Sequence, residues 1–240
     1  MRNYITFNNV SSKDYGVYLS GQGVFKAPQK EIEFLPIPGR NGDLLRLNDR
    51  WQNIEVTYPA FIYANFDQNV QNFRNFLNSV NGYAKLYDSY HPYEYRMAVY
   101  AAEFDPDVLP NNQAGRFDIV FNCKPQRFLT SGDTPFTYSS TTFTMFNAQR
   151  FASLPKMEIT CPSGSDECTI VLRDQIITIK NPGTNIIIDS EMQDCYWGTA
   201  NLNDKVSFSD YKFPVLIPGN NTFTIDEGMT VVVTPKWWRI

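Results

Sequence analysis

Strict alternation of apolar and polar residues is the feature that most limits how this chain can fold. In residues 116–123, RFDIVFNC, apolar side chains occupy every second position: Phe117, Ile119, Phe121 and Cys123. Residues 52–62, QNIEVTYPAFI, repeat this period of two. Successive side chains of a β-strand point to opposite faces, so the period predicts strands with one buried face. We expect a mainly β protein.

One segment has the period of an α-helix instead. In FDQNVQNFRNFLNSVNG the apolar residues fall at helical spacing: Phe66, Val70, Phe73, Leu77 and Val80. This predicts one long helix over residues 67–80, packed on a sheet. Asn65 or Asp67 is suited to cap its start, and Gly82 to take the left-handed position after its end. YAKLYDS and YRMAVYAAEF, joined by a turn at YHPYE, predict a β-hairpin after the helix.

A domain boundary is predicted near residues 125–137. There KPQRFLTSGDTPF carries two prolines and a turn cluster directly after a strong strand pattern. Beyond it about eight short strand patterns follow one another, separated by turn signals, which predicts a sandwich or jelly roll. The patterns are PKMEIT, CTIVL, QIITIK, TNIIID, KVSF, FPVLI, NTFTID and MTVVVT.

Composition narrows the class of protein. The formal net charge is −4, which argues against a nucleic-acid binder, because such proteins present a basic face. The opening MRNYITFNNV has no apolar core of a secretory signal, so we expect a chain made and kept in the cytosol. The four cysteines form no CxxC pair, and the chain has one histidine, so we expect no zinc site. Reduced, structural cysteines are predicted, with a Cys161–Cys168 bridge as the alternative.

The sequence offers little catalytic chemistry. His91 lies alone in a turn, and no nucleophile elbow, phosphate-binding loop or zinc-protease motif is present. EFDPDV, with Glu103, Asp105 and Asp107, lacks the glycine and closing glutamate of an EF-hand. DSEMQDCYW carries Asp189, Glu191 and Asp194, and both clusters fit solvated loops. A glycosidase needs only two carboxylates, so that class stays open. We expect no enzyme, no metal and no cofactor.

The loop PIPGRNG, residues 36–42, holds an arginine between two bends. Pro38 with Gly39 favours a turn, and Gly42 permits a second. Arg40 between them is a rigidly presented guanidinium, suited to a carboxylate or to carbonyl groups. The alternative is an ordered surface loop without a partner.

Several segments, in this order, resemble the distal tail proteins of long-tailed, non-contractile bacteriophages. They are YITFNNVSSKDYGVYL, PGRNGDLLRLNDRWQNIEVTY, GYAKLYDSYHPYEYRMA, GRFDIVFNCKPQRFL, IIIDSEMQDCYWGTANLNDKVSFSDYKFPVLIPGNNTFTID and TPKWWRI. The resemblance implies an N-terminal domain, residues 1–130, of β-sheet with one helix. It implies a C-terminal galectin-like β-sandwich, residues 131–240, whose last residues, 235–240, return to the N-terminal domain.

The resemblance also implies a function and partners. Six N-terminal domains would close a ring at the tail end, which joins the tail tube protein to the tail-tip hub or tail-associated lysin protein and lets DNA pass. The tape-measure protein is a further possible partner. Neither sequence-specific nucleic acid binding nor membrane insertion is implied. The protein would be assembled in the bacterial cytoplasm and reside in the virion, at the tail tip.

A closed ring needs two complementary surfaces on each subunit. We expect them on the segment 34–51 and on the hairpin at 87–96, because loops and sheet edges can extend into a neighbour. The candidate ring-interface residues are Arg40, Asn41, Trp51, Tyr87, Tyr90, Tyr93 and Tyr95. The alternative for the four tyrosines is that they merely cover the sheet.

Two further groups of aromatic residues remain. In the resemblance the final segment packs near the domain junction, so Trp237 and Trp238 would dock the domains; the alternative is that both rings belong to the sandwich core. Tyr196, Trp197 and Tyr211 could form an aromatic platform for sugar. The alternative function is therefore a carbohydrate-binding module that recognises host cell-wall sugar.

Overall fold

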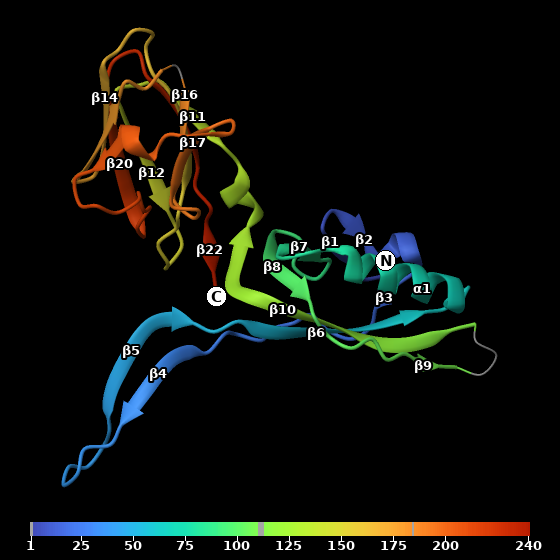
Figure 1. Ribbon diagram of the computed structural model, residues 1–240. Helices are drawn as coiled ribbons and strands as arrows, with labels where there is room; N and C mark the ends of the chain where they lie inside the picture. Colours follow the sequence, from blue (N-terminus) through green and yellow to red (C-terminus); the bar gives the residue numbers. More distant parts are fainter. Residues whose placement is uncertain (1, 110–112, 184) are drawn as a thin grey trace. The chain divides into compact units, whose positions relative to one another are not determined.

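The computed structural model describes residues 2–109, 113–183 and 185–240 (Figure 1). The chain divides into two compact units, one formed by residues 1–127 with Ile240 and one by residues 128–239. The sequence had placed the division after residue 130 and had returned residues 235–240 to the first domain. Among the described residues, no helix has the length and apolar character needed to cross a membrane.

The N-terminal unit is built on a twisted sheet with strand order β2-β1-β7-β8-β10-β6-β3, and β9 also pairs with β10. Its strands are β1 (Ile5–Phe7), β2 (Val10–Ser11), β3 (Tyr18–Leu19), β6 (Ile54–Ile62), β7 (Ala84–Asp88), β8 (Glu94–Tyr100), β9 (Asp107–Val108) and β10 (Gly115–Leu129). A 3-10 helix, η1 (Ser12–Tyr15), follows β2.

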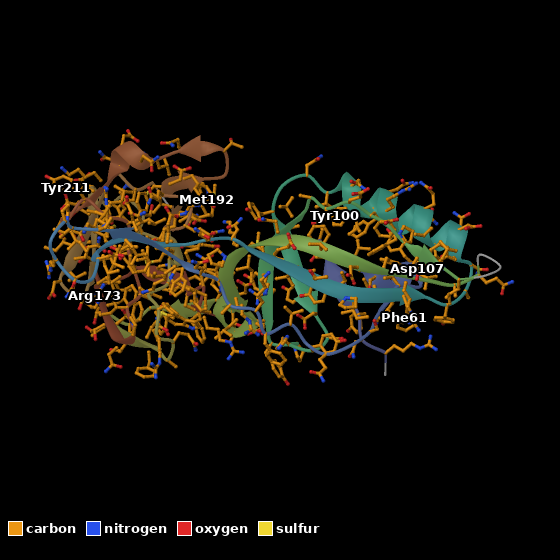
Figure 2. All side chains as sticks on the ribbon, turned by 90° about the horizontal axis from the view of Figure 1, so that it is seen from below. Phe61, Tyr100, Asp107, Arg173, Met192 and Tyr211 are labelled. Atoms are coloured by element: carbon orange, nitrogen blue, oxygen red, sulfur yellow. The ribbon has the colours of Figure 1, made fainter. Side chains whose placement is uncertain are left out.

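Strands β6 and β10 carry the alternation that the sequence showed. They pair antiparallel from Gly115↔Ile62 to Cys123↔Ile54, so their apolar positions share one face. Figure 2 shows Phe61 on the side of β6 away from the helix. The predicted strand 116–123 is correct but too short, because β10 continues to Leu129. Pro125 lies beyond the last pair of this ladder, so its missing N–H costs no hydrogen bond to β6.

The predicted helix is α1 (Phe66–Ser79), which covers one face of the sheet (Figure 1). Its buried residues are Phe66, Phe73 and Leu77, as the helical period indicated. The predicted side-chain cap is wrong, because Asn65 has φ 52° and makes no side-chain capping bond. Gly82 has φ 83°, the left-handed conformation expected after the helix.

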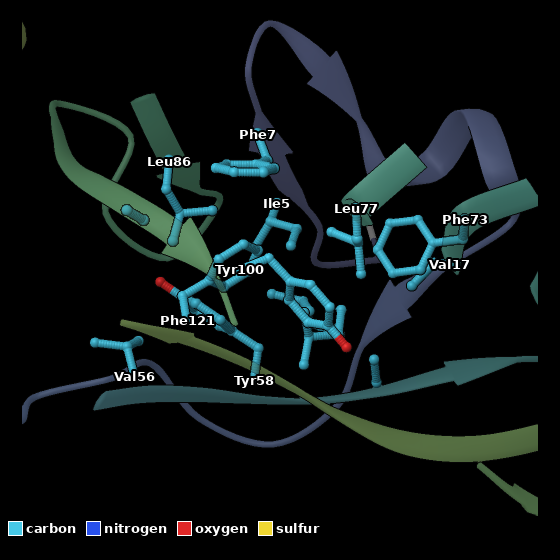
Figure 3. Close-up of a cluster of buried hydrophobic side chains, with 14 of the residues drawn as sticks. Ile5, Phe7, Val17, Val56, Tyr58, Phe73, Leu77, Leu86, Tyr100 and Phe121 are labelled. Carbon is cyan, nitrogen blue, oxygen red and sulfur yellow. The ribbon is translucent and has the colours of Figure 1, made fainter. Parts of the chain in front are cut away.

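The core of this unit is rich in aromatic rings (Figure 3). Phe121 of β10 lies 4.9 Å from Phe7 and 5.9 Å from Tyr100, measured between ring centroids. From the helix, Phe73 and Phe76 contact Tyr15 of η1. The buried face of the sheet and the apolar side of α1 thus form one continuous core.

A two-stranded hairpin extends from this unit without joining its main sheet (Figure 1). It consists of β4 (Lys30–Leu35) and β5 (Leu44–Trp51). In the connecting loop Gly39 and Gly42 have φ 75° and 83°, so both predicted bends are present. Only glycine adopts these angles without steric cost.

The C-terminal unit is a sandwich of two sheets. One has the order β11-β21-β13-β16-β17-β18, with strands Phe136–Tyr138, Thr230–Thr234, Lys156–Thr160, Asn185–Asp189, Asp194–Trp197 and Ala200–Asn201. The other has the order β12-β20-β14-β15-β19, with strands Thr142–Asn147, Gly219–Ile225, Glu167–Leu172, Gln175–Lys180 and Val206–Phe208. Two 3-10 helices, η2 (Thr130–Asp133) and η3 (Asn203–Lys205), and the short strand β22 (Trp238–Arg239), which pairs with β10, complete the chain.

The mainly β fold with a single α-helix among the described residues, followed by a β-sandwich, is confirmed. One predicted strand is wrong: FPVLI forms only an isolated bridge between Leu216 and Ser153. Leu216 is nevertheless fully buried, so its apolar character reflects the core rather than a ladder. The sequence prediction also missed β11, β12, β17 and β18, of which all but β17 are edge strands.

All four cysteines are free and buried, as the reduced-cysteine prediction required. Burial raises the pKa of Cys123 and of Cys195 to about 12, from an ordinary value of 9.0. In the folded protein these thiols therefore stay neutral up to about pH 12. In the unfolded chain the same thiols ionise from about pH 9.

Folding stability should consequently decline as the pH rises from about 9 toward 12, since only the unfolded chain gains thiolates in that window. Below pH 9 the contribution of the thiols is complete. Urea unfolding at pH 8, 9 and 10, followed by circular dichroism, measures the decline. A Cys123→Ala variant controls for other alkaline groups and should lose less stability between pH 8 and 10 than the unmodified protein. An equal loss in both would contradict the assignment.

Candidate assembly surface

The β4–β5 hairpin has one apolar and one charged face. Its register pairs Ile32 with Leu47 and Phe34 with Leu45. Because residues two apart share a face of a strand, these four side chains lie together on one face. We call Ile32, Phe34, Leu45 and Leu47 the apolar hairpin face.

The opposite face of the hairpin carries paired charges. Arg46 lies 3.6 Å from Glu33, and Arg50 lies 3.4 Å from Glu31. The amide of Asn48 also donates to Glu31, at 3.2 Å. These exposed ion pairs fix the strand register more than they add stability, since each contributes at most about 1 kcal/mol. The pair Leu35 and Leu44 also lies on this face, toward the tip, and Leu44 is 51% exposed.

Within the described residues, the apolar hairpin face is largely uncovered. Ile32 is 38% exposed, Phe34 60%, and Leu45 and Leu47 are each 56% exposed. An isolated two-stranded hairpin is only marginally stable in water, and it gains stability from packing against another layer. A contiguous exposed apolar patch rimmed by charges is typical of a protein–protein contact site.

The predicted interface residues of this segment lie at its two ends. Arg40 and Asn41 are exposed in the tip loop, where the N–H of Arg40 donates to the carbonyl of Ile37. Trp51 lies at the base, half-buried, with the ammonium group of Lys30 5.1 Å from the centre of its ring. The apolar hairpin face lies between them. The sequence prediction chose this segment but did not name these four residues, because only the strand pairing shows that they share a face.

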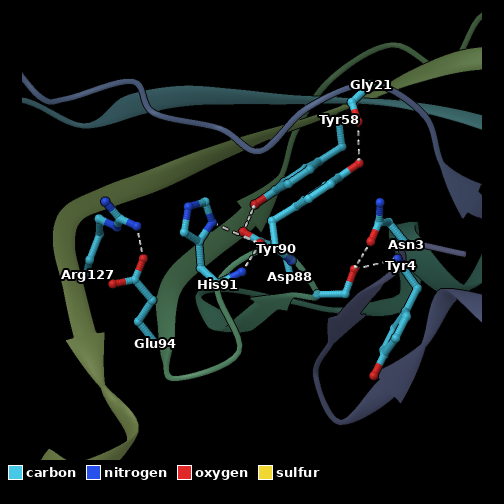
Figure 4. Close-up of polar contacts among 10 residues, drawn as sticks. Asn3, Tyr4, Gly21, Tyr58, Asp88, Tyr90, His91, Glu94 and Arg127 are labelled. Carbon is cyan, nitrogen blue, oxygen red and sulfur yellow. Dashed lines mark hydrogen bonds and ion pairs between the residues drawn. The ribbon is translucent and has the colours of Figure 1, made fainter. Parts of the chain in front are cut away.

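A carboxylate anchors the turn of the predicted β7–β8 hairpin (Figure 4). Asp88 Oδ1 accepts hydrogen bonds from the backbone N–H groups of Tyr90 and His91, at 3.0 and 2.9 Å, and lies 3.1 Å from His91 Nδ1. Its other oxygen accepts from the hydroxyl of Tyr58, at 3.1 Å. Burial, followed by the charge of Asp88, raises the pKa of Tyr58 well above its usual value. His91 is thus a structural turn residue.

A second buried pair, Glu94 with Arg127, lies beside this turn (Figure 4). Two buried opposite charges in contact are strongly interdependent, because removing one leaves the other without compensation. Neither residue was singled out in the sequence. Their separation along the chain hides the pairing, which the register of the sheet creates.

The tyrosines of this hairpin differ in accessibility. Tyr93 is strongly exposed, whereas Tyr95 is buried, with its ring against Tyr87 and below the ammonium group of Lys85. Tyr90 donates its hydroxyl to the carbonyl of Gly21. Tyr93 is therefore the ring of this set that is best placed for an external contact, and Tyr95 contributes to packing within the chain.

The C-terminal tryptophans have clear contacts inside the sandwich unit. Trp237 packs against its core, and Trp238 stacks on Phe151 with ring centroids 4.6 Å apart. The indole N–H of Trp238 donates to the carbonyl of Ala152, at 2.8 Å. These contacts agree with the alternative in which both rings belong to the sandwich. Docking of the two domains by these rings stays a prediction.

Backbone contacts hold the last segment close to η2. Lys236 N–H donates to the carbonyl of Gly132, and Leu129 N–H donates to the carbonyl of Trp237. Lys236 Nζ also lies 2.9 Å from Asp133 Oδ1. A β-carbon on Gly132 would lie 2.4 Å from the backbone nitrogen of Trp237, which leaves no room for a side chain.

Replacing Gly132 by alanine should therefore displace the segment that contains Lys236 and Trp237. Overpacking of this kind costs about 1–3 kcal/mol of folding stability. Thermal unfolding measures the loss, and limited trypsin digestion should show faster cleavage after Lys236. Ser131→Ala, at an exposed neighbouring position, is the matched control and should change neither result. Unchanged digestion of the Gly132→Ala protein would show that the segment does not need this close approach.

The three candidate sugar-platform residues do not form one surface cluster. Tyr196 and Trp197 lie on β17, where Tyr196 is half-buried and Trp197 is 46% exposed. Tyr211 follows β19 of the other sheet, and no ring contact joins it to either residue in the described part of the chain. A joint platform therefore stays a prediction without support from these positions.

The two acidic clusters of the sequence differ in their surroundings. Asp189 accepts hydrogen bonds from the N–H groups of Glu191 and Met192 in a turn, and Asp194 accepts from the amides of Asn201 and Asn203. Glu103, Asp105 and Asp107 line a groove on the N-terminal unit together with Arg116. Across the described residues, no three histidine, cysteine or acidic side chains are placed to hold a metal ion.

Comparison with protein families defines the class to which this fold and surface belong. Residues 10–123 match the family described as a phage tail protein RIFT-related domain. This range contains α1, most of the N-terminal sheet and the β4–β5 hairpin. The candidate assembly surface lies within this matched range.

Solved structures extend the likeness over the whole chain. The SPP1 Dit protein (gp 19.1) matches with a TM-score of 0.77 at 11% sequence identity, over 100% of both chains. That protein is described as a paradigm of the hub adsorption apparatus in phages that infect Gram-positive bacteria. A chain of the phage P2 baseplate, in its activated conformation with Ca, matches with a TM-score of 0.58 at 11% identity, over 97% of each chain. A search of curated proteins gave no match.

The predicted resemblance is thus confirmed at two levels. Residues 10–123 are similar to a phage tail domain, and the whole chain has the fold of the SPP1 Dit protein.

Proposed function

We propose that this protein is a structural distal tail protein, six copies of which close a ring through their N-terminal units. The ring would join the tail tube protein to the tail-tip hub or tail-associated lysin protein and would let DNA pass through its centre. The observation that carries the proposal is the uncovered apolar hairpin face within a phage tail domain.

The hairpin suits a ring because a closed ring is built from head-to-tail contacts. Each copy inserts one surface into a different surface of its neighbour, so a projecting element on one side is sufficient. The hairpin extends away from the main sheet, with an apolar face that needs a cover and a charged face that remains in water. Burial of the four apolar side chains would supply the stabilisation that a two-stranded hairpin lacks alone.

The proposed role needs no reactive groups. His91 is held in a turn by Asp88, Asp189 and Asp194 accept hydrogen bonds from nearby backbone and side-chain groups, and the thiols are buried. We therefore propose a non-enzymatic protein without cofactor, located at the tail tip of the virion after assembly in the bacterial cytoplasm. The net charge of −4 suits a channel wall that does not hold DNA.

Native mass spectrometry of the full chain, over a range of concentrations, tests the proposal. We expect a species of six subunits, and ring-shaped particles of the same sample in negative-stain electron microscopy. Addition of the tail tube protein or of the hub protein of the same phage should favour the ring. A protein that stays monomeric at about 100 μM, alone and with both partners, would contradict the proposal.

A further inference from the structure

A pocket on the C-terminal unit, remote in sequence from the hairpin, has the features of a ligand site. It lies where β14 turns into β15 and where the segment after β19 passes, and its volume is about 320 Å³. Ligand pockets in proteins begin near 300 Å³, so the space suits one small ring rather than a long chain. The residues that matter here are Arg173, Asp174, Gln175, Asp210, Tyr211 and Lys212. All but Tyr211, the residue between Asp210 and Lys212, line the pocket.

The polar groups of the pocket are held in place before any ligand arrives. The amide nitrogen of Gln175 donates to Asp210 Oδ1 and to the carbonyl of Lys212, both at 2.6 Å. Arg173 Nη2 donates to the carbonyl of Val215, at 3.0 Å. The bond from Gln175 also lowers the pKa of Asp210, because it stabilises the ionised carboxylate. Fixed donors and acceptors reduce the entropy lost on binding.

Hydrogen-bonding capacity remains after these internal bonds are counted. Oδ2 of Asp210 and the whole carboxylate of Asp174 have no partner among the described residues. The second terminal nitrogen of Arg173 is likewise without a described partner, and the amide oxygen of Gln175 is a further acceptor. The pocket therefore offers donors and acceptors at the same time.

The charges of the pocket cancel. Arg173 and Lys212 are cationic, and Asp174 and Asp210 are anionic. A ligand with a net charge would be attracted by two of these side chains and repelled by the other two. A neutral ligand with hydroxyl groups can bond to all four side chains, because each hydroxyl both donates and accepts. Charge balance thus selects against phosphates, carboxylates and amines.

An exposed aromatic residue, Tyr211, stands in the chain between the two lining residues Asp210 and Lys212. Tyr211 is 95% exposed and has φ 58°, a backbone conformation that a bulky residue rarely adopts. Arg173 on the neighbouring turn also has a positive φ, of 55°. Figure 2 shows both residues at the surface of the C-terminal unit. A fully exposed tyrosine in a strained turn offers an apolar face to a ligand and serves no packing within the chain.

We propose that this pocket binds a neutral sugar ring, whose hydroxyl groups pair with Arg173, Asp174, Gln175 and Asp210 and whose C–H face lies on the ring of Tyr211. This function goes beyond the proposed assembly role and does not depend on it. It also differs from the aromatic platform expected from the sequence, because neither Tyr196 nor Trp197 takes part.

Saturation-transfer NMR of the full chain, with three sugars of the same ring scaffold, tests the proposal. Glucose is neutral, glucuronate anionic and glucosamine cationic; galactose and N-acetylglucosamine extend the neutral set. We expect saturable binding of at least one neutral sugar and weaker binding of both charged ones. Tyr211→Ala should weaken the neutral sugar about tenfold. Asp210→Asn should weaken it as well, because the fixed carboxylate is lost.

Trp197→Ala is the matched control, since it removes an exposed aromatic side chain from the other sheet and should leave binding unchanged. Circular dichroism of each variant checks folding. We expect Tyr211→Ala to fold normally, because Tyr211 is exposed. Three outcomes would overturn the proposal: no neutral sugar saturates, a charged sugar binds most tightly, or Trp197→Ala removes binding that Tyr211→Ala retains.

Discussion

Substitution of Phe34 by aspartate together with Leu45 by lysine should abolish ring assembly while the monomer stays folded. The two residues are paired across the hairpin, so the new charges attract each other and keep the register. Burying a side chain of this size in an interface contributes about 1.5–3 kcal/mol. Loss of two such side chains from each contact weakens association by at least about 100-fold. Native mass spectrometry of the variant should then show monomers only.

A matched variant separates this effect from a general increase in surface charge. Phe146 lies on β12 of the C-terminal unit and is as exposed as Phe34. Phe146→Asp should therefore assemble like the unmodified protein. Assembly of the Phe34→Asp, Leu45→Lys protein at unchanged concentrations would show that the apolar hairpin face is not the ring contact.

Replacement of Phe121 by alanine should give the largest loss of folding stability among these variants, about 3–5 kcal/mol. Phe121 is fully buried, and its ring contacts Phe7, Tyr58 and Tyr100 from three other strands. Alanine would leave a cavity between elements that are already fixed by the sheet, so the core cannot collapse onto it. Urea unfolding at pH 7, followed by circular dichroism, measures the free energy of unfolding.

Phe25→Ala provides the control, since this phenylalanine is strongly exposed and its loss should cost less than about 1 kcal/mol. A loss below about 1 kcal/mol for Phe121→Ala would mean that the rings around it repack freely. The core in Figure 3 would then be less specific than its interlocked rings indicate.

The sequence predicts elements well wherever one period dominates. The alternation in 116–123 and the helical spacing from Phe66 to Val80 led to β10 and α1 with errors of a few residues at their ends. In both segments a single buried face decides the pattern. The strand predicted at FPVLI is wrong because Leu216 is buried in a connecting segment. A short apolar run has the same sequence pattern whether it is buried in a strand or in a loop.

The candidate surfaces were harder to predict than the elements. The segment 34–51 was chosen from its loop and from resemblance, but the apolar hairpin face depends on the pairing of Phe34 with Leu45, which one strand alone does not reveal. The Glu94–Arg127 pair and the pocket around Gln175 and Asp210 join residues far apart in the chain. No local pattern encodes such contacts, because tertiary pairing creates them.

The four buried, unbridged cysteines have a consequence for a particle that changes environment. Disulfides form and persist in oxidising surroundings and are rare in the reducing interior of a cell. A protein whose core relies on neutral thiols keeps the same covalent structure inside the bacterium and after lysis. The sandwich therefore needs no oxidative maturation step to reach its final covalent structure.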